Sequence, residues 1–381
     1  MIERKYGQHH FGEIFLRDSI DGCWEPWMKR ADEILDDEDL IDTVYEALRR
    51  RLPKSATRGV TETNIHYPTD SSLLGDGVRV LTRTMKRIVE IGGNVGERMR
   101  DRMRSVSHRV MEIARASRSK VQKQGNERLQ ASYKRLLNAT GQVVAQAKRI
   151  ADDVKNGVKR SRKVVDQLRL EAFKAELERM IPLIKQVIRQ TKARVFHNDV
   201  HVSDKIVSLF ETATQIIRKG KASNPTEFGR LIKIQETENQ IITDYEVCDQ
   251  RPADSSLLLK SIEAHHQKLG RVPHTVAADA GFFSGPNETA AMKMGVKRVA
   301  IPNRSTKSAD RRALQKKRWF RQAQAWRTGC EGRISVLKRR HGLNRCRYRG
   351  DDGMKRWVGL GVIADNLINI GRVLALRAAE V

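Results

Sequence analysis

The chain has 381 residues, of which 73 are lysine or arginine and 46 are aspartate or glutamate, so its formal net charge at pH 7 is +27 and its isoelectric point is near 10.3. Such a balance is typical of a soluble protein that binds polyanions, most commonly nucleic acid, although a membrane surface or a ribosomal role fits the charge equally well. Aromatic residues make up only 5% of the chain, which argues against a base-stacking platform for single strands.

The amino terminus and the cysteines exclude further classes. The first ten residues (MIERKYGQHH) have no apolar run of a signal peptide, and no later stretch approaches the apolar length of a membrane span. The four cysteines are far apart and form no C-x-x-C pair, which excludes a disulfide framework and a zinc ribbon. We therefore expect a cytoplasmic, nucleoid-associated protein with free thiols.

The first half of the chain has helical patterns. Residues 1–58 place apolar residues at helical spacing among acids and near a basic run, which predicts a small helical segment. Residues 78–220 are basic and amphipathic with one proline, Pro182, and they predict two or three long helices packed as a hairpin or bundle. A coiled-coil arm without chemistry explains this block, and its basic outer face could also follow a DNA backbone.

From residue 225 the pattern becomes that of an α/β protein. Short runs rich in β-branched residues predict strands, and longer amphipathic runs predict helices. In chain order we expect strands at residues 231–235 and 241–247, a helix at 254–269, a strand at 275–279, a helix at 287–294, a strand at 296–301, and helices near 309–325, around Glu331 and at 357–376.

Three charged residues, Arg327, Glu331 and Lys338, form the most informative pattern. At about 100° per residue, steps of four and eleven from Arg327 place all three within about 40° of one another on one helical face. A carboxylate between two cations suits metal-assisted chemistry on phosphates. A solvated charged face with an ordinary ion pair explains the triplet alone equally simply.

The spacing of this triplet resembles the tyrosine, arginine, glutamate and lysine signature of bacterial insertion-sequence transposases of the DDE type, with Gln324 at the place of the tyrosine. The resemblance covers residues 60–375 and is most specific from residue 225 onward. Four further segments follow the order of that family, namely residues 226–229 (TEFG), 276–283 (VAADAGFF), 295–302 (GVKRVAIP) and 330–338 (CEGRISVLK).

The resemblance implies an α/β fold with a large helical part, in which a ribonuclease-H-like catalytic core carries a long basic helical insertion. The domains that we expect are an N-terminal helical segment at residues 1–58, a remnant of the first core strand with the start of a helix at 59–77, the basic helical insertion at 78–220 and the catalytic domain at 221–381.

Asp279 follows an apolar strand and precedes Ala280 and Gly281, which let the loop bend away and leave the carboxylate at the carboxyl edge of the sheet. By itself, such an aspartate caps a turn more often than it catalyses. The resemblance makes Asp279 and Glu331 catalytic metal ligands that, with a first aspartate, hold two divalent ions. Oxygen ligands suit Mg²⁺ or Mn²⁺, and two ions can activate a water or 3′-hydroxyl and stabilise the leaving oxygen.

The first carboxylate departs from the family pattern. Family members carry a valine-aspartate strand directly before a segment like residues 62–74 (ETNIHYPTDSSLL), and here Thr57 stands at the place of that aspartate. We therefore expect that an internal segment, including the first catalytic strand, is missing. Asp70 is the nearest substitute and our third catalytic candidate. Because residues 68–74 (PTDSSLL) are nearly repeated at 252–258 (PADSSLL), a helix N-cap role suffices for both Asp70 and Asp254.

A dense basic field surrounds Glu331, and it would neutralise DNA phosphates without reading base sequence. His341 within it is predicted to be a surface histidine. The partner we expect is double-stranded DNA, at element ends and target, bound by a homo-oligomer without a membrane. The DNA-binding candidates are Lys317, Arg318, Arg327, Lys338, Arg339 and Arg340.

Three functions remain open at this point. The first is a metal-dependent transposase that cleaves and joins DNA at the ends of a mobile insertion element. The second is an internally deleted relative that binds DNA but cannot assemble its metal ions. The third is a basic helical DNA-binding scaffold protein, which would explain the helical insertion but not the motifs around Asp279 and Glu331.

Overall fold

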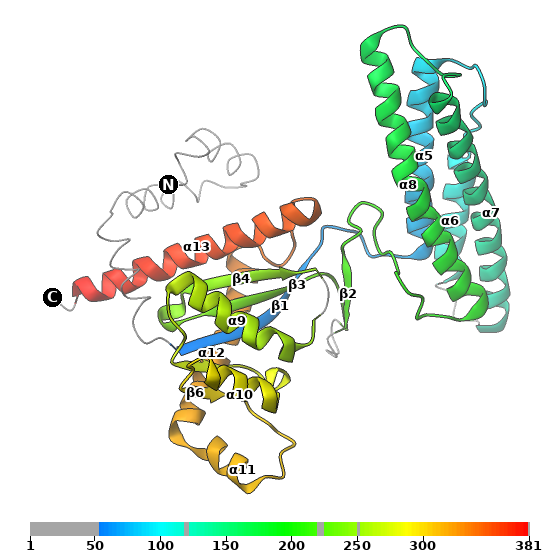
Figure 1. Ribbon diagram of the computed structural model, residues 1–381. Coiled ribbons are helices and arrows are strands. Elements are labelled where there is room, and N and C mark those ends of the chain that lie inside the picture. The colour runs from blue at the N-terminus through cyan, green and yellow to red at the C-terminus, as the bar shows by residue number, and fades with distance from the viewer. Residues whose placement is uncertain (1–52, 118–121, 219–224, 250–251, 380–381) are drawn as a thin grey trace. The chain divides into compact units, whose positions relative to one another are not determined.

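The computed structural model describes residues 53–117, 122–218, 225–249 and 252–379, so most of the helical segment expected at residues 1–58 lies outside it (Figure 1). The chain divides into two compact units. Of the described residues, we call those in 53–59, 231–344 and 355–379 the sheet unit, and those in 60–230 and 345–354 the bundle unit.

A six-stranded mixed sheet has the strand order β2-β3-β1-β5-β6, with β4 paired to β3. Strand β1 is parallel to β5 and β5 to β6, whereas β3 is antiparallel to both β2 and β4. The predicted hairpin forms as β3 and β4, and the overall class is α/β with a large helical part, as expected. The strands are β1 (Pro53–Glu62), β2 (Gln215–Arg218), β3 (Thr226–Glu236), β4 (Ile242–Cys248), β5 (Thr275–Ala277) and β6 (Arg298–Ala300).

Strand β1 stands where the sequence suggested a missing strand. It pairs in parallel with β5, with Pro53 opposite Thr275 and Ser55 opposite Ala277. The expectation that the core lacks a strand here is therefore wrong. Backbone hydrogen bonds to strands on both sides hold this segment extended, and such pairing between distant parts of the chain cannot be read from local sequence.

The helices of the sheet unit follow the prediction in order, with one boundary moved. The two helices expected near residues 309–325 and around Glu331 are separated at Lys317, so the second begins at Arg318 and includes Glu331. The second helix, α12, packs against β5 and β6. The elements are α9 (Asp254–Leu269), η2 (Ala280–Phe282), α10 (Gly285–Lys293), α11 (Ala309–Lys316), α12 (Arg318–Arg340) and α13 (Gly350–Ala379).

Helix α13 corrects another expectation, because Gly350–Leu376 is long and apolar enough, by length and composition, to cross a membrane. Its polar side chains nevertheless make specific contacts with β4. The Asn366 amide donates to the Ile242 carbonyl and accepts from the Ile242 N–H, both at 2.8 Å. A Cβ on Gly359 would lie 2.5 Å from the Tyr245 hydroxyl oxygen. These contacts make α13 a packing helix of the sheet unit.

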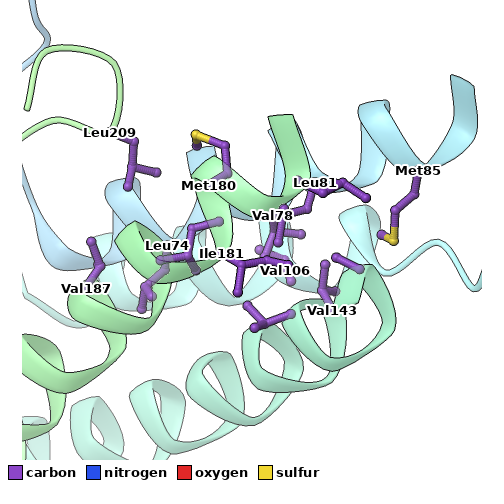
Figure 2. Close-up of a cluster of buried hydrophobic side chains, with 14 of the residues drawn as sticks. Leu74, Val78, Leu81, Met85, Val106, Val143, Met180, Ile181, Val187 and Leu209 are labelled. Carbon is purple, nitrogen blue, oxygen red and sulfur yellow. The ribbon is translucent and has the colours of Figure 1, made fainter. Parts of the chain in front are cut away.

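The bundle unit contains four helices, where two or three were predicted. The extra division arises at Gly93 and Gly96, whose φ angles of 70° and 77° end one helix and start a loop. Apolar side chains from all four helices meet in one core, together with Leu209 from the segment that follows them (Figure 2). The helices are α5 (Asp70–Gly92), α6 (Met103–Ala116), α7 (Gln122–Lys155) and α8 (Val164–His197).

Gly229, the glycine of the TEFG segment, lies where β3 approaches β1 closely. A Cβ at this position would lie 2.0 Å from the Thr61 carbonyl oxygen and 2.7 Å from the Glu62 Cα. We expect Gly229→Ala to lower the free energy of unfolding by about 1–3 kcal/mol, because the two backbones must move apart. Thermal unfolding followed by circular dichroism measures this as a lower Tm.

Gly141→Ala is the matched control, because a Cβ on Gly141 in the middle of α7 would meet no atom within 4 Å. Alanine favours a helix over glycine by about 0.5–1 kcal/mol, so this variant should have a raised Tm. The steric account of Gly229 is wrong if both variants shift the Tm in the same direction.

Candidate functional site

Asp279 lies two residues beyond the end of β5, at the carboxyl edge of a strand flanked by β1 and β6. It is the N-cap of η2, and its Oδ1 accepts a hydrogen bond from the Ala280 N–H at 2.7 Å. The residue is exposed. Asp279 therefore has the turn-capping contact that its sequence position suggests, and its carboxylate is also open to solvent at the edge where α/β sheets usually hold ligands.

Thr57 lies two residues beyond the part of β1 that pairs with β5, and Asp279 lies two residues beyond the paired part of β5. The paired residues are Pro53 with Thr275, Lys54 with Val276 and Ser55 with Ala277. Continuing this parallel register by two residues brings position 57 opposite Asp279, and neighbouring strands are about 4.8 Å apart. An aspartate at position 57 would thus be the neighbour of Asp279 across the two strands. In this chain the position carries threonine.

Helix α12 is fixed to the sheet at two points. Near its first turns, Gln324 Nε2 donates to the Ala278 carbonyl at 3.2 Å and to the Ala300 carbonyl. Further along, a Cβ on Gly59 of β1 would lie 2.6 Å from Ile334 Cγ2. The helix therefore runs from the ends of β5 and β6 across β1.

Glu331 lies on α12 between these two points. It is seven residues after Gln324, so the two positions lie within about 20° of each other around the helix and about 10 Å apart along it. Position 331 therefore follows Gln324 by almost two full helical turns. The side chain of Glu331 lies outside those that the structure describes.

Arg58 and Asp254 border the same edge from the opposite face of the sheet. The Arg58 guanidinium pairs with the Asp254 carboxylate, and its Nη2 donates to the Pro252 carbonyl at 3.3 Å. A Cβ on Gly281 would lie 2.5 Å from Asp254 Oδ2, so this carboxylate also borders the turn that follows Asp279. The N-cap of α9 is Ala253, and the N-cap role expected for Asp254 is wrong. Sequence reasoning missed this pair because its partners are far apart in the chain.

The residues at this edge do not fit the two-ion centre that the resemblance implies. The expected donors are Asp279 and Glu331, and the sequence has threonine, which has no carboxylate, at position 57, where the family has its first aspartate. Among the side chains that the structure describes, no group of three or more histidine, cysteine, aspartate or glutamate residues could hold a metal ion.

Asp70, the substitute considered for the first carboxylate, belongs to the bundle unit, whereas Asp279 and Glu331 belong to the sheet unit. It is the first residue of α5 and is 6% exposed. Its carboxylate pairs with Arg194 of α8, whose Nη2 also donates to the Tyr133 hydroxyl at 3.1 Å. Thr69 is the N-cap of α5, so the capping role expected for Asp70 is wrong. The ion pair gives Asp70 a structural role within the bundle.

The six DNA-binding candidates differ in exposure. Lys317 and Arg318 at the start of α12 and Arg339 and Arg340 at its end are exposed, and Lys338 is half-buried. Arg327 is 9% exposed, and its Nε donates to Gln324 Oε1 at 3.3 Å. Its guanidinium therefore supports the side chain that holds α12 to the strand ends, and the four exposed cations are the better candidates for phosphate contacts.

His341 is not the surface residue that we expected. Its side chain is 7% exposed, and its Nε2 lies 3.3 Å from Asp365 Oδ1. Arg333 contacts the same carboxylate at 3.3 Å. The histidine therefore joins a buried charged cluster between α12 and α13, because the chain turns inward directly after the basic end of α12.

The sequence model of the transposase DDE domain family matches residues 288–371. This range begins after Asp279 and contains Glu331, all of α12 and most of α13. Searches of curated proteins and of solved structures found no match. Transposase DDE domains act on DNA and generally use divalent metal ions. The resemblance inferred from the sequence is confirmed for residues 288–371, which match the transposase DDE domain family.

Proposed function

We propose that this chain binds the DNA ends of a mobile insertion element as a homo-oligomer but cleaves and joins them very slowly. The observation that carries this proposal is the threonine at position 57, which follows the β1–β5 pairing by two residues, as Asp279 does on the other strand. An in-line displacement at phosphorus needs the attacking and leaving oxygens held in one geometry, and two carboxylates without a third do not enforce it.

The exposed cations of α12 supply the binding part of the proposal. Lys317 and Arg318 precede Glu331, and Arg339 and Arg340 follow it. A helix of 23 residues is about 34 Å long, so the two pairs can contact well-separated phosphates of one duplex. If the cations at both ends of α12 bind phosphates of one DNA strand, that strand would lie along the helix and pass Glu331. Such contacts position DNA without selecting a base sequence.

The other two functions, a fully active transposase and a basic helical scaffold, explain fewer of these observations. A fully active transposase needs a substitute for the first carboxylate, and the candidate substitute from the sequence, Asp70, is engaged by Arg194. A basic helical scaffold would leave the DDE domain at residues 288–371 without a role.

Asp279 and Glu331 are testable as a residual metal-binding pair. We expect the parent chain to bind Mn²⁺ weakly and the double variant Asp279→Ala, Glu331→Ala to lose that binding in isothermal calorimetry. Removing two carboxylates removes the hard oxygen ligands, while the fold should keep its stability because like charges no longer repel.

The matched control is Asp152→Ala with Glu178→Ala, which removes the same charge from exposed positions of the bundle unit. This control should bind Mn²⁺ as the parent does. Unaltered Mn²⁺ affinity in the Asp279 and Glu331 variant would refute their assignment as ligands.

A further inference from the structure

The bundle unit holds a large share of the positive charge of the chain. Residues 70–197 contain 30 lysine and arginine residues against 13 aspartate and glutamate residues. The core of the bundle is apolar, with Leu74, Leu81 and Met85 fully buried (Figure 2). Stability of the four helices therefore does not account for so many cations, which lie outside this core.

Helix α6 separates an apolar inner face from a basic outer face. Val106 points into the core in Figure 2, and Ile113, seven residues later, lies on the same side and is 3% exposed. On the opposite side of the helix, four side chains form a stripe, because they point to solvent in directions that differ by at most about 60° around the helix axis. This stripe consists of Arg104, His108, Met111 and Arg115, and the exposed Arg98 and Arg100 precede the helix.

The acids near this stripe are already paired with cations other than its arginines. Asp101 contacts Lys86 at 2.7 Å, and Glu112 contacts Arg109 at 3.0 Å and His108 Nδ1 at 3.3 Å. Within the described part of the chain, no ion-pair partner occurs for Arg98, Arg100, Arg104 or Arg115. We call these four residues the arginine face. Their guanidinium groups are exposed, and none is held in an ion pair of the bundle.

We propose that the arginine face binds the phosphate backbone of duplex DNA, as a second contact separate from the DDE domain. An arginine fork can donate two hydrogen bonds to one phosphate. Arg104 and Arg115 are about 16 Å apart along α6, which corresponds to about five base-pair steps of duplex. No aromatic residue interrupts the stripe, so the surface fits the backbone of a duplex rather than unstacked bases.

Duplex DNA is the polyanion that the rest of the molecule favours, because residues 288–371 belong to a family that acts on DNA. The arginine face does not depend on position 57 or on any metal ligand. A chain that cannot cleave DNA would therefore still bind through it.

The test uses the full chain with Arg98, Arg100, Arg104 and Arg115 all changed to alanine. Binding to a labelled duplex is followed by fluorescence anisotropy from 50 to 200 mM salt. Each phosphate contact contributes about 0.9 to the slope of log affinity against log salt, so the slope should fall by roughly 3 to 4. Affinity at the lowest salt should fall at least about tenfold.

The matched control changes four exposed cations elsewhere on the bundle to alanine: Lys155, Lys185, Arg189 and Lys192. We expect it to keep most of the affinity and slope of the parent. Equal losses in both variants would mean that binding follows net charge, and an unchanged slope in the arginine variant would mean no contact. Either result overturns the inference, as would tighter binding to polyglutamate or duplex RNA than to duplex DNA.

A third variant separates this inference from the proposed function. Changing Lys317, Arg318, Arg339 and Arg340 to alanine weakens only the contacts proposed for α12. Loss in this variant with no loss in the arginine-face variant would overturn the inference and leave the proposed function standing. The reverse result would support the arginine face and contradict the role of α12. Circular dichroism should show the parent Tm for all three variants, since exposed positions on helices and beside them tolerate alanine.

Discussion

Changing Thr57 to aspartate is expected to raise Mg²⁺-dependent nicking of element-end DNA by roughly 10²-fold or more, because a bridging carboxylate contributes several kcal/mol to binding and orienting two ions. Strand β1 is already paired with β5, and position 57 follows the last paired residue, Ser55, by two residues, as Asp279 follows Ala277. No inserted strand or helical segment is therefore needed to test this position. The measurement is the rate of nicking on a labelled duplex under single-turnover conditions.

Two variants control this experiment. Thr57→Asn adds a side chain of similar size without a charge and should remain at the parent rate. Thr57→Asp combined with Asp279→Ala should lose the gain, because the two carboxylates act on the same ions. Robust cleavage by the parent chain that disappears in Asp70→Ala would instead show that Asp70 is the first carboxylate and that position 57 is irrelevant.

Duplex binding by the parent chain is expected to weaken by about 10³ to 10⁵ between 50 and 200 mM salt, if 6 to 10 phosphates are contacted. The expectation rests on the net charge of +27 and on the exposed cations of α6 and α12. Each contact releases condensed counterions, and this release becomes less favourable as salt rises. The same titration by anisotropy provides the slope.

A duplex of the same length and scrambled sequence is the control for specificity. Its affinity should lie close to that of the element end, because phosphate contacts hold no sequence information. A flat salt dependence would contradict the electrostatic account of binding, and a large preference for one sequence would require base contacts that our assignment does not include.

Local sequence patterns were sufficient to predict many of the strands and helices of the sheet unit. The β-branched runs predicted β3 and β4, and the apolar run before Asp279 predicted β5 and the exposed carboxylate at its end. Helix α9 ends at Leu269, before Gly270 with a φ of 70°, as the glycine indicates. These features depend on residues that are close in the sequence. Hydrophobic periodicity and turn residues predict structure over that range.

The errors concern contacts between distant segments. Residues 53–62 form β1 because they pair with β5. Their own sequence suggested instead that an internal segment was missing. Asp70 and Asp254 occur in nearly identical segments, and both were expected to cap helices. Each instead pairs with an arginine, Arg194 or Arg58, that lies more than 100 residues away in the chain. A repeated local motif thus identified two equivalent helix starts but not the charges that each one meets.

The contact of Asn366 with Ile242 also bears on how the chain reaches its folded state. Among the described strands, β4 pairs only with β3, so its other side would expose unpaired N–H and C=O groups. The Asn366 amide accepts a hydrogen bond from the Ile242 N–H and donates one to the Ile242 carbonyl, as the backbone of a neighbouring strand would. Helix α13 is synthesised more than 100 residues after β4. During translation the edge of β4 therefore stays unpaired until α13 leaves the ribosome. In a nascent chain stalled before α13 is made, this edge could pair with a strand of another chain.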